Sequence, residues 1–259
     1  MKVLSIGNSF GLDTMYHLPG VCKDLGVSDF TFAILYIGGC SINRHYHNLL
    51  NSLAEYKYYK NTGLGWSIVE GKSIQEALAE EDWDIISIQH GTGDGSRYTS
   101  LESYENLVPL VKNVKGIYGK PVKIAFNMAW VADPDCPRRE IMSYGGNQIL
   151  MYEKLTELTR DQIATLKEID VVSPTGTAIQ NARSVIERPL TRDGFHLSFD
   201  LGRYIASLTF GKVLLGLDIE KVEWIPEGVL EREREVAKAA ALAAVKEPYV
   251  ATKLESKEN

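Results

Sequence analysis

Cysteine is scarce in this chain of 259 residues, which has three: Cys22, Cys40 and Cys136. Their number is odd, their spacing is wide and no Cys-x-x-Cys pair is present. The sequence therefore indicates neither a disulfide framework nor a zinc site. A chain that does not depend on disulfides is typical of a reducing compartment, and this predicts a cytoplasmic location.

Long hydrophobic runs are also missing. No apolar stretch approaches the ~20 residues of a membrane-spanning helix, so we expect no association with a membrane. Met1 and Lys2 lead directly into the apolar run Val3–Ile6, without the ~7–15 apolar residues and cleavage site of a signal peptide. A secreted or periplasmic location would require a leader that has been trimmed from this sequence.

Positive charge is in deficit. The chain has 28 Lys and Arg against 34 Asp and Glu, a net charge of -6, and no basic stripe. This argues against a nucleic-acid partner and fits a neutral or small substrate. The length allows one large domain with a proper core, so we predict a single domain over residues 1–250 and a polar tail over residues 251–259, frayed from Lys253 to Asn259.

Strand-like and helix-like segments alternate along the sequence. Apolar strand runs are expected at residues 3–7, 30–37, 84–88, 122–128 and 170–173, and a small hairpin at residues 56–69. Helices are expected at residues 13–25, 41–54, 73–81, 100–118, 138–168 (one helix, or two with a break near Gly145), 200–215 and 226–245. Strands separated by helices imply crossovers, so the predicted fold is α/β: a three-layer α/β/α sandwich with a central, mostly parallel five-stranded sheet of the flavodoxin-like kind.

Reactive groups in such a sheet gather beyond the carboxyl ends of the strands. The first run ends at Gly7-Asn8-Ser9, the second at Gly38-Gly39-Cys40 and the third at Gln89-His90-Gly91. After the last run comes the string Asp193-Gly194-Phe195-His196. These four strings carry a serine, a glycine pair, an amide and an acid–histidine pair.

Their order resembles the sequence blocks of the SGNH (GDSL-like) serine hydrolases. The run Ile6–Phe10 resembles the first block, Gly39 the second-block glycine, and Asp193–His196 the terminal Asp-x-x-His block. The longer strings around Gly39 and Asp193 are similar to a bacterial branch of this superfamily related to carbohydrate esterases. Two positions depart from the pattern: Gln89 stands near the place of the usual third-block asparagine, and Asn8 stands where many relatives have Asp.

The resemblance implies a catalytic triad with Ser9 as nucleophile, His196 as general base and Asp193 as the group that orients it. The implied oxyanion hole consists of the backbone N–H groups of Ser9 and Gly39 and the side-chain amide of Gln89. The implied reaction is hydrolysis of a carboxylic ester, with an O-acetyl group on a carbohydrate as the leading substrate, and without a metal ion or organic cofactor.

Each of these residues has a structural alternative. Ser9 could end a strand and cap a helix, Asp193 could form an Asx-turn with Gly194, and His196 could be a structural histidine. Gln89 could simply form hydrogen bonds at its strand end. Two functional alternatives stay open as well: a non-catalytic carbohydrate-binding module on the same scaffold, and an acyltransferase.

Other residues near the strand ends are candidates for substrate contact: Arg44, His90, Tyr98 and Trp130. A buried core position is the alternative for Trp130. His45 and His47 are two residues apart and would point to different faces of a helix, which argues against a metal site. Cys40 is expected to be a small buried residue rather than a nucleophile. The alanine-rich segment 226–245 predicts an amphipathic helix that is solvated or contacts a partner subunit. The sequence does not predict the oligomeric state.

Overall fold

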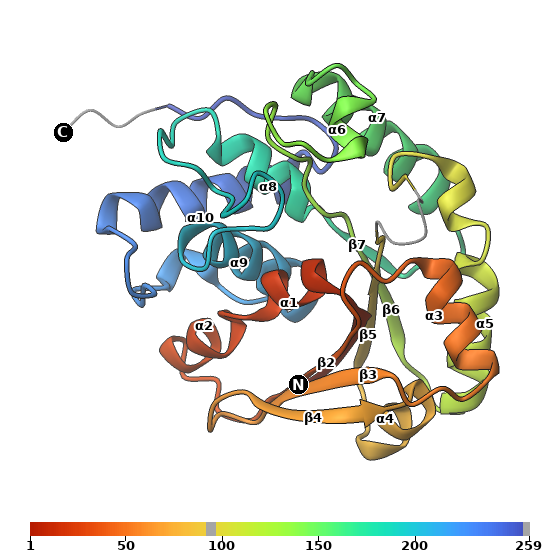
Figure 1. The fold of residues 1–259 in the computed structure, drawn as a ribbon. Helices are drawn as coiled ribbons and strands as arrows, with labels where there is room; N and C mark the ends of the chain where they lie inside the picture. The colour runs from red at the N-terminus through yellow and green to blue at the C-terminus, as the bar shows by residue number, and fades with distance from the viewer. Residues whose placement is uncertain (92–96, 256–259) are drawn as a thin grey trace. The chain divides into compact units, whose positions relative to one another are not determined.

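The computed structural model describes residues 1–91 and 97–255. The chain folds into two compact units, each built from several segments (Figure 1). The first unit consists of Met1–Leu12, Ser28–Asn127 and Leu158–Val172, and the second of Asp13–Val27, Met128–Glu157 and Ser173–Asn259. Over the described part of the chain, no helix is both long and apolar enough to cross a bilayer.

Over the described residues, the sheet has seven strands in the order β4-β3-β2-β1-β5-β6-β7. They are β1 (Lys2–Gly7), β2 (Thr31–Tyr36), β3 (Tyr56–Asn61), β4 (Ser67–Lys72), β5 (Ile85–Gln89), β6 (Lys123–Asn127) and β7 (Val171–Ser173). Strand β1 pairs in parallel with β2 and β5, and β5 pairs in parallel with β6, whereas β3 is antiparallel to both β2 and β4. The predicted α/β class with a mostly parallel sheet is confirmed.

The predicted number of five strands is wrong, because the hairpin at residues 56–69 joins the sheet. Strand β3 lies beside β2, with Ile34 opposite Tyr59 and Leu35 opposite Tyr58. Its burial alternates at the start, since Tyr56 and Tyr58 are buried while Lys57 is exposed. A half-buried strand of this kind extends a sheet that has one covered face. The hairpin therefore adds two antiparallel strands to the five that were predicted.

In the first unit, three helices pack with one face of the sheet: α3 (Ile42–Leu50), α4 (Ile74–Glu80) and α5 (Leu107–Tyr118). Leu4 lies opposite Ile86 and Ile6 opposite Ile88, and all four belong to the same buried apolar cluster as residues of these helices. A short 3-10 helix (Leu101–Tyr104) precedes α5, and a π-helical turn (Thr159–Ile163) lies near the end of the unit. Alternation along each strand thus places one set of apolar side chains in this core.

Helix α1 (Ser9–Met15) begins in the first unit and ends in the second. The other helices of the second unit are α2 (Leu18–Asp24), α6 (Arg139–Met142), α7 (Gln148–Leu158), α8 (Thr175–Ala182), α9 (Leu201–Leu215), a 3-10 turn (Ile219–Lys221) and α10 (Glu231–Lys246). Helix α10 packs against α8 and α9. It does so through a buried face that includes Ala237, Ala240, Ala241 and Ala244. The alanine-rich face therefore packs within its own chain.

Several helix boundaries differ from the sequence expectations. The helix expected at residues 13–25 is two helices, because Pro19 cannot continue the hydrogen bonding of α1 and instead occupies the first turn of α2. Helix α8 was not predicted, since Gly176 and its threonine neighbours are weak helix formers. A Cβ at Gly176 would lie 2.0 Å from the carbonyl oxygen of Ala129, so glycine permits this close packing. The alternative break near Gly145 is confirmed, where Gly145 has a φ of 62°.

The C-terminal tail is bound over its described part. The N–H of Thr252 donates to Oδ1 of Asn181 at 2.6 Å, and the N–H of Leu254 donates to Oγ of Ser184 at 3.1 Å. Both acceptors belong to the chain in and just after α8, within the second unit. Within the tail that was expected to fray, Leu254 is therefore hydrogen-bonded to the second unit.

Replacing Ser73 by alanine is expected to lower the free energy of unfolding by about 1 kcal/mol. Ser73 and Glu76 form the capping box expected from their spacing: Oγ of Ser73 accepts from the N–H of Glu76 at 3.2 Å, and the Glu76 carboxylate accepts from the N–H of Ser73 at 2.7 Å. Urea unfolding measures the effect. Ser100→Ala is the matched control because Ser100 precedes a 3-10 helix without a side-chain cap. Equal losses in both variants would contradict the capping role.

Candidate active site

Asn8 forms the turn between β1 and α1. Its Oδ1 accepts the N–H of Phe10 at 2.9 Å, and its carbonyl oxygen accepts the N–H of Leu12 at 3.1 Å, which is the hydrogen bonding of a helix N-cap. Ser9 is the first residue of α1 and is only 9% exposed. The cap is supplied by Asn8, so the structural alternative in which Ser9 caps the helix is wrong.

The other end of the Asn8 amide connects three strand ends of the first unit. Nδ2 donates to the carbonyl oxygens of Cys40 and His90, both at 3.0 Å. Cys40 directly follows Gly39, and His90 directly follows Gln89. The structure therefore brings together, around one side chain, the three strand ends that carry the predicted oxyanion-hole residues.

Glycines allow these loops to approach one another. Gly39 has a φ of 64°, and the N–H of Cys40 donates to the carbonyl oxygen of Ile37 at 3.1 Å, as in a type II turn. A Cβ at Gly91 would lie 1.7 Å from the carbonyl oxygen of Cys40. No larger residue fits at position 91 without separating the loops after β2 and β5.

Gln89 is completely buried at the end of β5. Its Oε1 accepts from Oγ of Ser5 at 3.2 Å, so the expected strand-end hydrogen bond is present. Its Nε2 has no hydrogen-bond partner within the described chain and packs so closely under β1 that a Cβ at Gly7 would lie 2.0 Å from it. The amide thus holds a spare donor directly beneath the turn that carries Ser9. Its role in an oxyanion hole stays a prediction.

His90 lies in an aromatic enclosure of the first unit. Its ring stacks on Tyr98, with centroids 4.4 Å apart and an interplanar angle of 3°, and meets Phe10 edge-on at 5.2 Å. Neither ring nitrogen has a hydrogen-bond partner among residues 1–91 and 97–255. Burial without a partner disfavours the charged form and lowers the pKa of His90 to about 3. His90 is therefore neutral at physiological pH.

In the second unit, Asp193 and His196 form a hydrogen-bonded pair. Oδ2 of Asp193 accepts from Nδ1 of His196 at 2.6 Å, while its Oδ1 accepts the N–H groups of Phe195 at 3.0 Å and His196 at 2.7 Å. The predicted Asx-turn and the acid–histidine pair are thus both present. An ionised carboxylate is an acceptor only, so Nδ1 carries the proton and Nε2 of the neutral ring is the basic nitrogen.

The hydrogen bonds that Asp193 accepts determine its charge. Burial raises the pKa of this carboxyl, but the side-chain and backbone donors of His196, together with the N–H of Phe195, outweigh burial and hold the pKa below its usual value. Asp193 is therefore ionised at neutral pH. An ionised partner stabilises an imidazolium, as a general base requires when it accepts a proton.

Buried groups of the second unit hold the loop that carries this pair. Nε1 of Trp130 donates to the carbonyl oxygen of Phe195 at 2.6 Å, and the N–H of Asp133 donates to the carbonyl oxygen of Gly194 at 2.7 Å. Nη2 of Arg183 donates to Oδ1 of Asp133 at 2.7 Å. Trp130 is completely buried, so the hydrogen bond to Phe195 ties the Asp193–His196 loop to the interior of the unit. A direct contact with substrate would require this side chain to become exposed.

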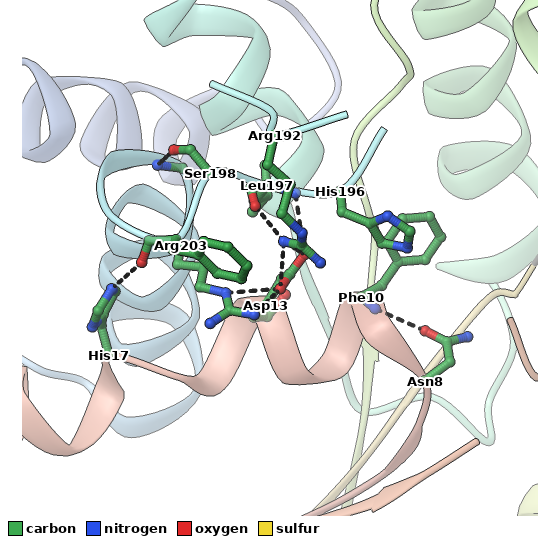
Figure 2. A network of polar contacts seen from close by, with 12 residues as sticks. Asn8, Phe10, Asp13, His17, Arg192, His196, Leu197, Ser198 and Arg203 are labelled. Carbon is green, nitrogen blue, oxygen red and sulfur yellow. Dashed lines mark hydrogen bonds and ion pairs between the residues drawn. The ribbon is translucent and has the colours of Figure 1, made fainter. Parts of the chain in front are cut away.

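Asp13 was not among the sequence-predicted residues, yet its carboxylate makes polar contacts with three other residues of this unit. Figure 2 shows its carboxylate between Arg192, Arg203 and the N–H of Leu197, the residue after His196. The carboxylate is completely buried. The sequence signal was a single acidic residue in an otherwise uncharged helix, one turn after Ser9. Two arginines as partners could not be read from that position.

The remaining candidates lie as follows. Arg44 is exposed on α3 and pairs with Glu55, its Nη2 lying 3.3 Å from Oε2. Tyr98 is completely buried against His90. The roles of Arg44, His90, Tyr98 and Trp130 in substrate binding stay predictions.

The neighbouring histidines and Cys40 occupy different environments. His45 is buried with Nδ1 2.9 Å from the hydroxyl of Tyr56, whereas His47 is exposed beside Asn51. Cys40 is buried, as expected, and forms no disulfide within the described chain. Among the described residues, no group of three or more His, Cys, Asp or Glu is placed to hold a metal ion.

Comparison with known proteins gives the relationship. Residues 2–244 match the model of DUF4886, a domain of unknown function. The chain belongs to the DUF4886 family. A crystal structure of a DUF4886 family protein from Bacteroides uniformis ATCC 8492 is 31% identical to it, with 98% of each chain covered and a TM-score of 0.91.

Two other solved structures resemble this DUF4886 protein at lower identity. A member of the lipolytic protein G-D-S-L family from Veillonella parvula is 15% identical, with 95% of this chain and 98% of that chain covered and a TM-score of 0.48. The acetyl xylan esterase AlAXEase is 15% identical, with 80% and 96% covered and a TM-score of 0.46. No curated protein matches the chain. Family membership follows from the DUF4886 matches, and the catalytic assignment depends on the residues of the site.

Replacing Asn8 by aspartate is expected to destabilise this DUF4886 protein by about 2–3 kcal/mol at pH 8, because a carboxylate cannot donate to the carbonyl oxygens of Cys40 and His90. The loss should be smaller at pH 5, where a protonated carboxyl can supply one donor. Urea unfolding at both pH values measures it. Asn113→Asp is the control, since Asn113 donates only to the carbonyl oxygen of Pro109. A loss at pH 8 no larger than that of the control would contradict the role of Asn8.

Replacing His90 by phenylalanine tests whether this histidine is neutral in the folded protein. The pKa of His90 is about 3 in the folded protein against 6.5 for an unperturbed histidine, so the unfolded state binds the extra proton and stability falls as pH drops below 6.5. Wild type should therefore lose about 2–3 kcal/mol of unfolding free energy between pH 7.5 and pH 4.5 that His90→Phe does not lose. His47→Phe is the exposed control. The same pH dependence in wild type and His90→Phe would refute the assignment.

Proposed function

We propose that this DUF4886 protein is a serine hydrolase that cleaves a carboxylic ester through an acyl-Ser9 intermediate. The observation that carries the proposal is the 2.6 Å hydrogen bond between Asp193 and Nδ1 of His196. It fixes the tautomer in which Nε2 can accept a proton, and it supplies a negative charge to stabilise the imidazolium. A histidine held in this way is the group that a serine hydroxyl needs to become nucleophilic.

The proposed reaction has two half-reactions. Nε2 of His196 takes the proton of the Ser9 hydroxyl while Oγ forms a bond to the ester carbonyl carbon. The tetrahedral intermediate then expels the alcohol, which receives its proton from His196. Water repeats the sequence on the acyl-enzyme, giving its proton to His196 and releasing the acid, after which Ser9 regains its proton. No oxidant, metal ion or organic cofactor is needed to balance these steps.

The proposed oxyanion donors are the N–H groups of Ser9 and Gly39 and Nε2 of Gln89. Asn8 supports this assignment, because its hydrogen bonds hold the residues after Gly39 and Gln89 at the turn that carries Ser9. Prearranged donors of this kind stabilise the charge that develops on the carbonyl oxygen. Nε2 of Gln89 has no hydrogen-bond partner within the described chain, but it is completely buried, so its part in the proposed oxyanion hole requires this nitrogen to become accessible to the substrate.

The proposed substrate class is an O-acetyl ester on a carbohydrate. It depends on the resemblance of the sequence blocks to carbohydrate esterases, because fold alone does not determine substrate. Acyl transfer to a sugar or alcohol uses the same acyl-Ser9 intermediate and differs only in the acceptor. A non-catalytic carbohydrate-binding module would need none of the proton transfers described above.

Replacing Ser9 by alanine should abolish labelling by a fluorophosphonate probe and lower kcat/KM for p-nitrophenyl acetate by about 10⁴-fold or more. His196→Asn should have a similar effect, because it removes the base. Ser100→Ala is the control serine and should react as the wild type does. Peptide mass mapping of the labelled protein locates the modified residue.

The same experiment separates the alternatives. A wild-type protein that neither reacts with the probe nor hydrolyses the ester would contradict the hydrolase proposal and favour the binding module. Labelling at Ser9 together with product formed mainly on an added sugar or alcohol would indicate an acyltransferase. Hydrolysis that persists in Ser9→Ala would exclude Ser9 as the nucleophile.

A further inference from the structure

The buried carboxylate of Asp13 holds the peptide group that follows His196. Oδ2 of Asp13 accepts the N–H of Leu197 at 3.1 Å and Nη1 of Arg192 at 3.0 Å. The same Nη1 of Arg192 donates to the carbonyl oxygen of Leu197. Both backbone polar groups of Leu197 are therefore bound, one to each member of the Asp13–Arg192 pair. All of these groups belong to the second unit.

A second arginine fixes Asp13 itself. Oδ1 accepts from Nε of Arg203 at 2.8 Å and lies 2.7 Å from its Nη2 (Figure 2). Arg203 is almost fully buried, and its guanidinium lies over the rings of Tyr16 and Phe199 at 4.4 Å and 4.7 Å. Two guanidinium nitrogens on one carboxylate oxygen, with aromatic rings beside the guanidinium, leave Arg203 little freedom to move. The Asp13 carboxylate is therefore held by a side chain of helix α9 as well as by the loop that contains Arg192 and Leu197.

We propose that Asp13 is a positioning residue for the general base His196. This inference rests on the proposed function. Asp13 accepts a hydrogen bond from the N–H of the peptide bond that joins His196 to Leu197, so it fixes the backbone on the C-terminal side of His196. Asp193 binds the imidazole of His196 and the N–H on its N-terminal side. Asp13 also lies one turn after Ser9 in α1, so the helix that begins with the proposed nucleophile carries the anchor of the proposed base.

The charges around this anchor give the proposal a distinct signature. Asp13 faces Arg192 and Arg203, and Asp193 faces His196. His17, beside Arg203, has its pKa lowered to about 4 by burial, so it is neutral above that pH. Neutralising Asp13 leaves an additional uncompensated positive charge beside the His196 loop, which disfavours a protonated His196. Neutralising Arg192 has the opposite electrostatic effect.

Asp13→Asn is expected to lower kcat for p-nitrophenyl acetate by about 10- to 100-fold, since misplacing a catalytic group by about 1 Å has an effect of that size. KM should change less than about twofold, because Asp13 is not proposed to bind substrate. The acid limb of the kcat/KM profile should move to lower pH. Arg192→Gln should also lower kcat but move that limb to higher pH. Opposite shifts are not expected from a merely structural role.

Glu233→Gln is the matched control. Glu233 is likewise a buried carboxylate paired with an arginine, its Oε1 lying 2.7 Å from Nε of Arg188, but none of its polar contacts is with the His196 loop. We expect it to lower thermal stability without changing kcat or the pH profile. If the wild type is active and both Asp13→Asn and Arg192→Gln have the same kcat and pH profile as Glu233→Gln, the positioning role is overturned and the proposed function stands. An inactive wild type that does not react with fluorophosphonate would instead refute the proposed function.

Discussion

The first unit depends on the hydrogen bonds of one neutral amide. Asn8 caps α1 with its oxygen and binds the carbonyl oxygens of Cys40 and His90 with its nitrogen, so one buried side chain holds three strand ends. Only a group with both a donor and an acceptor can do this, and the amide provides both without a buried charge. An ionised aspartate at this position could not make the same contacts.

In the second unit, hydrogen bonds hold the loop that carries Asp193 and His196 in one conformation. Asp193 forms hydrogen bonds within this loop, to the imidazole of His196. Trp130 and Asp133 donate to carbonyl oxygens of the loop, and Asp13 accepts the N–H of the peptide bond after His196. Backbone groups in a loop lack the regular partners of a helix or sheet, so other groups must complete their hydrogen bonds. Two of the side chains that do so here, Trp130 and Asp13, are completely buried, so packed groups hold the loop in place.

The groups around Asn8 and the groups around His196 differ in charge. Around Asn8 the buried groups are neutral, including His90, whose pKa burial lowers to about 3. Around His196 they are charged and paired, with Asp13 between two arginines and Asp193 ionised beside the imidazole. This contrast agrees with the proposed chemistry, in which the groups around Asn8 receive a developing negative charge and His196 accepts a proton.

Local patterns in the sequence were sufficient for the strand runs, the Ser73 capping box, the break near Gly145 and the Asp193–His196 pair, because each depends on residues a few positions apart. The seven-strand sheet, helix α8 and the bound tail were decided by tertiary packing, since an edge strand or a glycine-containing helix forms only where a neighbour covers it. The connections made by Asn8 and the arginine partners of Asp13 join residues 32 and 82 positions apart in one case and 179 and 190 in the other. No short-range pattern encodes such pairs, because the folded backbone alone brings them within hydrogen-bond distance.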